Sequence, residues 1–179
     1  MSVLITGGSG NLGGALVQHF LNSGTSVTTT SHLGSTPVGA TSIAIDLSRP
    51  GSGEELALRL ASEDFKVIIH NAADQRVSEI AQQDSQAIHA MLSTNLASIA
   101  EFTSAWARSK KVPESIIGIS SVEAASARPG HALYGASKAG LSAYLRTAAV
   151  ELAPTRVNSI RLGLMDRSGL REQWPTGVQ

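Results

Sequence analysis

Three side chains in the second half of the sequence have the types and spacing of a proton-transfer site. Tyr134 and Lys138 are four residues apart in a helical pattern, so their Cβ atoms share one face at about 5–6 Å. A phenol titrates near about pH 10, and a nearby ammonium group lowers its pKa because the positive charge favours the phenolate. Ser121 ends a predicted strand, where its hydroxyl can hydrogen-bond a carbonyl oxygen. The three residues indicate acid–base chemistry on a carbonyl or alcohol.

A glycine-rich turn near the N-terminus predicts a dinucleotide site. Gly7, Gly10 and Gly13 lie between an apolar run and a helical pattern that begins at Leu12. This spacing permits a tight turn, a close approach of the backbone to a pyrophosphate, and close packing of helix on strand. Free N–H groups and the helix dipole at the start of the helix favour phosphate binding.

The residues after the second predicted strand bear on the choice between NAD and NADP. A carboxylate at that point would bind the ribose 2′-hydroxyl and repel a 2′-phosphate. The sequence has no acid there and reads Thr30, Ser31, His32, Leu33. We therefore expect NADP, with Ser31 and His32 as donors to the 2′-phosphate. NAD stays open as the alternative because no Arg or Lys is present.

Alternating strand and helix patterns must position these residues. Strands are predicted at 3–6, 27–30, 42–47, 66–71, 115–121 and 156–162, and helices at 12–22, 54–64, 85–110 and 132–153. Apolar strands alternating with helices indicate a parallel sheet with right-handed crossovers. We expect a single NAD(P)-binding domain over residues 1–179, of the α/β class, with a Rossmann-type doubly wound sheet in three α/β/α layers.

Composition excludes several classes of function. The 179 residues include 14 basic and 14 acidic side chains, so the chain lacks the excess of Lys and Arg typical of nucleic-acid or anionic-membrane binding. The absence of cysteine excludes disulfides, thiolate catalysis and Cys-ligated metals, and no His, Asp or Glu group has metal-site spacing. No apolar run approaches the roughly 18–20 residues of a membrane span. We expect a cytoplasmic protein with no metal and no nucleic-acid or membrane partner.

The sequence resembles the short-chain dehydrogenase/reductase family along nearly its whole length. The matching segments are the glycine turn at 6–13, Asp46-Leu47, His70-Asn71-Ala72-Ala73, Asn95, Ile119-Ser120-Ser121, Tyr134 to Lys138, and 156–163. The resemblance implies hydride transfer between a nicotinamide cofactor and a small carbonyl or alcohol substrate.

The resemblance also implies individual roles. Tyr134 would be the general acid/base, and Lys138 would lower its pKa and bind the nicotinamide ribose. Ser121 would orient the substrate carbonyl, and Asn95 would support a water chain to Lys138. Asp46 would contact the adenine amino group. The residues expected to bind the cofactor are Gly7, Ser9, Gly10, Asn11, Leu12, Gly13, Ser31, His32, Asp46, Leu47, Asn71, Ala72, Ala73, Tyr134, Lys138, Gly163 and Leu164.

The sequence departs from the family pattern near its C-terminus. Leu162 replaces a family proline, and Arg167 stands where the family has a threonine near the nicotinamide carboxamide. The sequence stops at Gln179, where family members continue through a substrate-covering helix and a seventh strand. We therefore expect a C-terminally incomplete chain whose sixth strand is an exposed hydrophobic edge. The substrate is not identified.

Other interpretations stay open. The glycine spacing is similar to that of extended family members, which favours a sugar-nucleotide epimerase or dehydratase, and the altered segment 162–167 leaves a non-catalytic NADP-binding sensor or scaffold. The helices at 85–110 and 132–153 have apolar residues on several sides, and the resemblance implies a homodimer or homotetramer through them. We interpret Arg128 and His131 as loop residues rather than substrate contacts, and His70 as a packed or cofactor-adjacent residue rather than a metal ligand.

Overall fold

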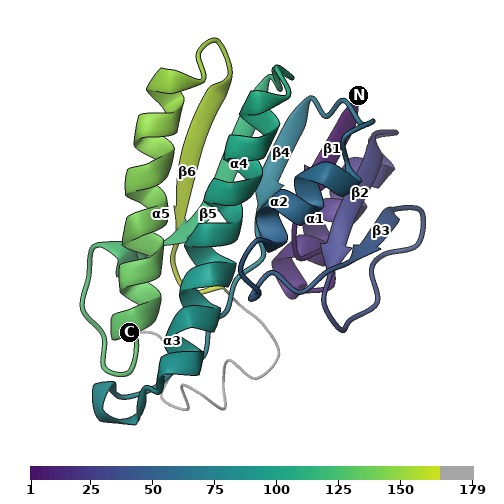
Figure 1. Cartoon of the computed structure of the whole chain (residues 1–179). Coiled ribbons are helices and arrows are strands. Elements are labelled where there is room, and N and C mark those ends of the chain that lie inside the picture. The colour runs from purple at the N-terminus through teal and green to yellow at the C-terminus, as the bar shows by residue number, and fades with distance from the viewer. Residues whose placement is uncertain (166–179) are drawn as a thin grey trace.

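The computed structural model describes residues 1–165; the expectations for Arg167 and for the rest of the segment 166–179 fall outside this part of the chain. A six-stranded parallel sheet forms its centre (Figure 1). The strands are β1 (Ser2–Ile5), β2 (Ser26–Ser31), β3 (Thr41–Ala44), β4 (Val67–His70), β5 (Ser115–Ser121) and β6 (Arg156–Leu162). Their spatial order is β3-β2-β1-β4-β5-β6, which confirms the Rossmann-type doubly wound sheet. The order reverses between β1 and β4, and ligands of such sheets bind at the carboxyl ends of strands near this point.

Helices cover the two faces of the sheet unequally. One face carries α1 (Asn11–Asn22), which lies behind the sheet in Figure 1. The front face carries α2 (Ser52–Arg59), α4 (Ser98–Arg108) and α5 (Ala132–Glu151), and α3 (Ser85–Leu92) precedes α4. Short turns complete the described elements: η1 (Ile80–Gln82), the π-turn η2 (Ser93–Ala97) and η3 (Val122–Ala124).

Strand β1 contributes side chains to two hydrophobic cores, one on each face of the sheet. Successive side chains of a strand point to opposite faces. Leu4 joins the larger core beneath α2, α4 and α5, where Phe102 stacks on Trp106 at 5.4 Å between ring centroids. Val3 and Ile5 join the smaller core beneath α1. The loops at the carboxyl ends of the strands are therefore carried by a scaffold packed on both sides.

Two helices differ from the sequence-based expectation. The single helix expected at 85–110 is divided by η2, where the backbone hydrogen bonds span one extra residue. The helix expected at 54–64 begins earlier and ends earlier, at Ser52–Arg59. The carboxylate of Glu101 on α4 accepts hydrogen bonds from the backbone N–H groups of Gly51 and Gly53, at 3.1 and 3.0 Å. This contact between helices satisfies donors at the start of α2, which no local side chain caps.

Strand β6 lies at the edge of the sheet in residues 1–165. Val157 is buried against α5, whereas Arg156, Asn158, Ile160 and Arg161 are exposed. The expectation of a hydrophobic edge is wrong for this strand, because most of its exposed side chains are polar or charged. Such side chains disfavour edge-to-edge pairing.

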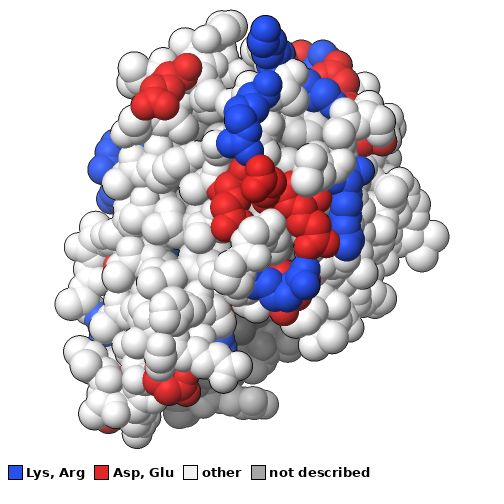
Figure 2. All heavy atoms as spheres, in the orientation of Figure 1, with Lys and Arg blue, Asp and Glu red and all other residues white. Residues whose placement is uncertain are grey.

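Charged side chains of both signs are interspersed over α2 and α4 on the face shown in Figure 2. Glu55 pairs with Arg49 and Arg59, and Glu54 pairs with Arg108. Alternation of this kind does not build the single-sign field that favours nucleic acid. Within residues 1–165, no helix is both long and apolar enough to cross a membrane.

His70 at the end of β4 is packed in the core, as expected. Its ring meets Phe102 edge-on at 5.6 Å between centroids, and its buried Nε2 has no hydrogen-bond partner. Burial lowers the pKa of His70 from 6.5 to about 4, because the charged ring would lose its hydration. The ring is therefore neutral at pH 7.

We expect His70 to make the fold acid-sensitive. As pH falls from 6.5 to about 4, the unfolded chain gains a proton that the folded chain does not, so the free energy of unfolding falls. The full loss amounts to about 3 kcal/mol. In urea titrations at neutral and acidic pH, His70→Phe should lose less stability on acidification than the wild type. A control, His89→Phe at an exposed position of α3, should behave like the wild type. Equal acid sensitivity of His70→Phe and the wild type would contradict this expectation.

Candidate active site

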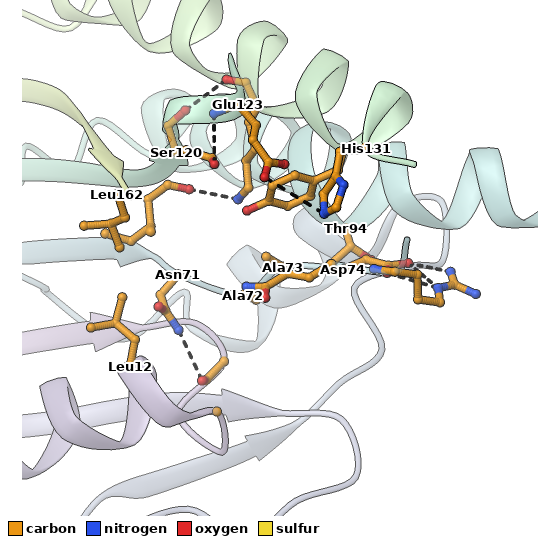
Figure 3. Close-up of a pocket in the computed structure, with 18 of the residues that line it drawn as sticks. Leu12, Asn71, Ala72, Ala73, Asp74, Thr94, Ser120, Glu123, His131 and Leu162 are labelled. Atoms are coloured by element: carbon orange, nitrogen blue, oxygen red, sulfur yellow. Dashed lines mark hydrogen bonds and ion pairs between the residues drawn. The ribbon is translucent and has the colours of Figure 1, made fainter. Parts of the chain in front are cut away.

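A cavity of about 1750 Å³ opens at the carboxyl ends of the strands. It exceeds the roughly 300–1,000 Å³ of pockets for single drug-sized ligands, so it has room for a dinucleotide and a substrate. Figure 3 shows Leu12 and Asn71 on one wall, and Glu123 and His131 on the opposite wall. The predicted site residues that line it are Gly7, Ser9, Gly10, Asn11, Leu12, Gly13, Ser31, His32, Asp46, Leu47, Asn71, Ala72, Ala73, Ser121, Tyr134, Lys138, Gly163 and Leu164.

Gly7 and Gly13 of the glycine turn have no room for a side chain. Gly7 has a φ of +74°, and a Cβ added there would lie 2.8 Å from the Cα of Ala72. A Cβ on Gly13 would lie 2.0 Å from the carbonyl oxygen of Gly7. The turn brings the start of α1 to the cavity with Gly10 as N-cap and no acidic side chain in the first turn. This backbone cradle fits a pyrophosphate, because free N–H groups at a helix N-terminus bind phosphate oxygens.

Asn71 holds the glycine turn in place. Its side-chain amide donates hydrogen bonds to the carbonyl oxygens of Thr6 and Gly7, at 3.0 and 3.2 Å. The Thr6 hydroxyl in turn accepts from the backbone N–H groups of Asn71 and Ala72, both at 3.0 Å. The segment after β4 is thus locked to the turn after β1, a structural contribution that the sequence did not predict for Asn71.

Tyr134, Lys138 and Ser121 meet at the opposite wall of the cavity. Lys138 lies one turn after Tyr134 on α5, and its Nζ is 5.8 Å from the centroid of the tyrosine ring. This Nζ donates a hydrogen bond to the carbonyl oxygen of Ile119 at 2.8 Å, and the lysine is 2% exposed. Ser121 hydrogen-bonds the Tyr134 hydroxyl from the end of β5. The three residues therefore face one point of the cavity.

The electrostatics of the pair differ from the sequence-based expectation. Burial raises the pKa of Tyr134, the hydrogen bond from Ser121 lowers it, and the nearby Glu123 carboxylate raises it further. Burial also lowers the pKa of Lys138 from 10.5 to about 8. The predicted lowering of the Tyr134 pKa by Lys138 is not found, because desolvation dominates both groups.

The family model for short chain dehydrogenases matches residues 1–178. The chain belongs to the short chain dehydrogenase family. No significant match was found among curated protein sequences.

Solved structures share the fold of this short chain dehydrogenase. A short chain dehydrogenase family protein from Francisella tularensis is 26% identical, with a TM-score of 0.85 over 96% of this chain and 73% of that one. A 4-hydroxyisoleucine dehydrogenase complexed with NADH is 24% identical, with a TM-score of 0.83 over 96% of this chain and 79% of that one. A dehydrogenase from Sphingobium yanoikuyae in complex with NADPH is 21% identical, with a TM-score of 0.83 over 96% of this chain and 73% of that one. The chain is therefore a member of an oxidoreductase family.

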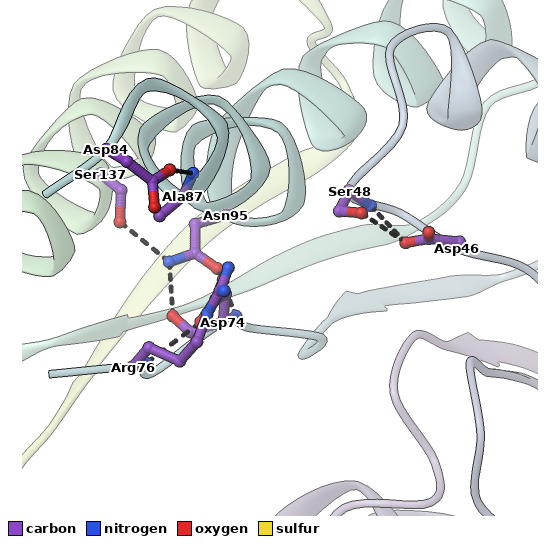
Figure 4. A network of polar contacts seen from close by, with 8 residues as sticks. All are labelled: Asp46, Ser48, Asp74, Arg76, Asp84, Ala87, Asn95 and Ser137. Carbon is purple, nitrogen blue, oxygen red and sulfur yellow. Dashed lines mark hydrogen bonds and ion pairs between the residues drawn. The ribbon is translucent and has the colours of Figure 1, made fainter.

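Asn95 is the one predicted site residue that does not line the cavity of the short chain dehydrogenase. It lies in η2 and is fully buried (Figure 4). Its Oδ1 accepts from the backbone N–H of Asp74 at 2.7 Å, and its Nδ2 donates to the Asp74 carbonyl at 2.9 Å and to the Ser137 hydroxyl at 3.0 Å. The side chain thus ties the loop after β4 to α5 near Tyr134, and a positioning role suits it better than direct contact.

Glu123 is a site residue that sequence reasoning missed. It lines the cavity two residues after Ser121, and its Oε1 accepts a hydrogen bond from Arg128 at 2.9 Å. His131 presents Nε2 to the same oxygen at 3.9 Å, and its ring lies edge-on to Tyr134 at 6.3 Å between centroids. Glu123 therefore holds both Arg128 and His131, and the His131 ring lies beside Tyr134. The spacing from Ser121 was the available signal for Glu123.

Ser31, at the end of β2, was expected to donate a hydrogen bond to a 2′-phosphate, but the structure shows it bonded within its own loop. The hydroxyl of Ser31 donates to the carbonyl oxygen of Gly34, so its hydrogen is already used within the loop. His32 retains a ring nitrogen that faces the cavity region near Asp46. In residues 1–165, no group of three or more His, Asp or Glu side chains gathers as metal ligands.

Proposed function

We propose that this short chain dehydrogenase transfers hydride between NAD(P)(H) and a small carbonyl or alcohol substrate, with Tyr134 as general acid/base. The observation that carries the proposal is the meeting of Tyr134, Lys138 and Ser121 across one cavity from a glycine cradle shaped for a pyrophosphate. Each group alone is a common polar residue. Together they provide cofactor binding, substrate orientation and a proton donor in one space.

Each residue of the site has a separate role in the reaction. The nicotinamide cofactor supplies or accepts the hydride when bound. The Ser121 hydroxyl donates a hydrogen bond that orients the substrate oxygen. In reduction, the Tyr134 hydroxyl gives its proton to the carbonyl oxygen, which forms the alcohol. In oxidation, the Tyr134 phenolate takes the alcohol proton, and the hydrogen bond from Ser121 stabilises this phenolate.

The protonation state of Tyr134 determines whether reduction or oxidation of the substrate is favoured at neutral pH. Burial raises the pKa of Tyr134, so the phenol holds its proton at pH 7 and is ready to act as an acid. Oxidation requires the phenolate and therefore speeds up as pH rises.

We propose NADP as the preferred cofactor because no acid follows β2 directly and His32 can donate to a 2′-phosphate.

Nicotinamide absorbance with a panel of ketones and secondary alcohols tests the proposal. We expect consumption of NADPH with at least one ketone at neutral pH and faster alcohol oxidation at alkaline pH. Nucleotide binding without turnover on any member of a broad panel would contradict catalysis and would favour a sensor or scaffold.

The outward face of α5 supports a proposal of self-association. Ala136, Ala143 and Thr147 are exposed there, and Val150 is 78% exposed. Small side chains permit close approach of two helices. We propose a homodimer or homotetramer formed through residues 85–110 and 132–153.

A further inference from the structure

A largely buried ion pair lies on the wall of the cavity that carries Tyr134. The Oε1 atom of Glu123 accepts a hydrogen bond from Nη1 of Arg128 at 2.9 Å, and only 11% of the Glu123 side chain is exposed. The other oxygen of this carboxylate, Oε2, is buried and has no hydrogen-bond partner among the described residues. Figure 3 shows Glu123 and His131 on this wall. A carboxylate with so little water around it acts on neighbouring groups with weak screening.

Two backbone contacts of Glu123 hold η3 beside the proton-transfer residues. The backbone N–H of Glu123 donates to the Ser121 hydroxyl oxygen at 3.2 Å, which leaves the hydroxyl hydrogen available to another acceptor. The carbonyl oxygen of Glu123 faces the first turn of α5, where a Cβ on Gly135 would lie 2.8 Å away. Gly135 follows Tyr134 directly. The turn that carries the carboxylate is therefore packed against the start of the helix that carries the tyrosine.

Lys138, the other charged group of α5 near Tyr134, loses its charge before the tyrosine does. Its Nζ lies 5.8 Å from the centroid of the Tyr134 ring, and burial lowers its pKa to about 8. Burial raises the pKa of Tyr134 above the usual 10, the hydrogen bond from Ser121 lowers it, and the charge of Glu123 raises it. Carboxylate and guanidinium groups ordinarily keep their charge where a phenol titrates, whereas an amine of this pKa does not. The charge that acts on Tyr134 in that range is therefore carried by the pair of Glu123 and Arg128.

Other ionisable side chains around Tyr134 have partners of their own. The His131 ring lies edge-on to Tyr134 at 6.3 Å between centroids, and its Nδ1 donates to the Pro129 carbonyl at 2.9 Å. Three more ionisable side chains line the cavity from the loop after β4 and from the start of α3: Asp74, Arg76 and Asp84. Asp74 accepts from Nε of Arg76 at 2.9 Å, and the third accepts from a backbone N–H of α3 at 2.7 Å.

We propose that Glu123 is a positioning residue that keeps the Tyr134 hydroxyl protonated, and that Arg128 limits this effect. A carboxylate beside a phenol disfavours the negatively charged phenolate, and a guanidinium favours it. The pair therefore biases the site toward giving a proton to a carbonyl oxygen, which is the direction of reduction. This inference rests on the proposed function, since it concerns the same proton donor.

Titration of the tyrosinate by ultraviolet absorbance tests this role without cofactor or turnover. Tyr134 and Tyr144 are the only tyrosines in the sequence, so in a Tyr144→Phe background the absorbance change reports Tyr134 alone. We expect the alkaline midpoint to fall by about 0.5 pH unit or more in Glu123→Gln and to rise by a similar amount in Arg128→Gln. The double variant lacks both charges, so its midpoint should lie between those of the two single variants.

The opposite signs separate the charge effect from a merely structural one. Loss of packing would move both single variants in one direction, toward the midpoint of an unfolded chain. Circular dichroism at each pH restricts the comparison to folded protein. Glu54→Gln is the matched control, because it breaks an exposed ion pair with Arg108 (2.6 Å) outside the cavity, and it should keep the wild-type midpoint.

The pH profile of alcohol oxidation gives a second readout. Its alkaline midpoint should follow the same order, lowest in Glu123→Gln and highest in Arg128→Gln. If Glu123→Gln does not stay folded, the rise in Arg128→Gln decides, since unfolding cannot produce a rise.

The outcomes distinguish this role of Glu123 from the proposed function. Equal midpoints in the wild type and both single variants, or shifts of the same sign, overturn the role of Glu123 and leave proton transfer by Tyr134 intact. Absence of turnover in the wild type overturns the proposed function, whereas the order of the tyrosinate midpoints still decides whether Glu123 keeps the hydroxyl protonated.

Discussion

A Tyr134→Phe variant is expected to lose turnover by about 10³-fold or more while its affinity for the nucleotide stays within about twofold. General acid–base catalysis contributes roughly 10²–10⁴-fold. Tyr134 has the only hydroxyl of α5 that lines the cavity, so no other hydroxyl of this helix can replace it as proton donor. The phenyl ring keeps the edge-on contact with His131, so the fold of the site is retained. Steady-state nicotinamide absorbance measures turnover, and nucleotide fluorescence titration measures affinity.

Tyr144→Phe is the matched control for this experiment. Tyr144 is the only other tyrosine in the sequence, lies on the same helix, and does not line the cavity. Its hydroxyl donates a long hydrogen bond of 3.4 Å to the carbonyl of Ala100. We expect wild-type turnover and a stability loss of about 1 kcal/mol or less. Equal turnover in the two phenylalanine variants would contradict the role of Tyr134.

A Lys138→Met variant is expected to lose turnover and to gain stability. Burial lowers the pKa of Lys138 to about 8, so at pH 7 the folded state holds a charged ammonium at a cost of about 3 kcal/mol relative to the unfolded chain. Methionine fills a similar volume without the charge, although it loses the hydrogen bond to Ile119, worth about 1 kcal/mol. We expect a net gain of about 1–2 kcal/mol in the free energy of unfolding, measured with urea in the absence of nucleotide.

The pH dependence of this gain provides its control. Between about pH 8 and 10.5 the unfolded chain binds a proton that the folded wild type releases, so wild-type stability rises with pH over this window. The advantage of Lys138→Met should therefore shrink as pH rises through it. A variant that is less stable than the wild type at pH 7, or whose advantage does not change with pH, would show that burial of Lys138 carries no charge penalty.

Local signals predicted the sheet and the glycine turn well. β5 and β6 begin and end at the predicted residues, because their apolar runs are bounded by Pro113, by the polar end at Ser121 and by Gly163. The glycine turn was predictable because its spacing reflects a steric requirement, which a Cβ on Gly13 would violate. Such requirements act between residues that are close in the sequence, or they are imposed by a single ligand.

Contacts between distant segments were not predictable from the sequence. The start of α2 depends on Glu101, a residue 48 positions away from Gly53. The side chain of Asn95 is hydrogen-bonded to Asp74 and Ser137, so the residue type alone did not predict that Asn95 lies behind the cavity and not in its lining. The pKa of Tyr134 was predicted in the wrong direction because the spacing of Lys138 reports proximity, whereas the shift is governed by burial.

The most direct test of proton transfer by Tyr134 is a single-turnover experiment on Tyr134→Phe beside Tyr144→Phe, with excess protein, NADPH and a ketone that the wild type reduces. Fluorescence reports bound nucleotide, and absorbance reports hydride transfer in the same sample. We expect bound nucleotide in both variants, with absorbance decay at the wild-type rate in Tyr144→Phe and almost none in Tyr134→Phe. Decay at the wild-type rate in Tyr134→Phe would contradict proton transfer by Tyr134.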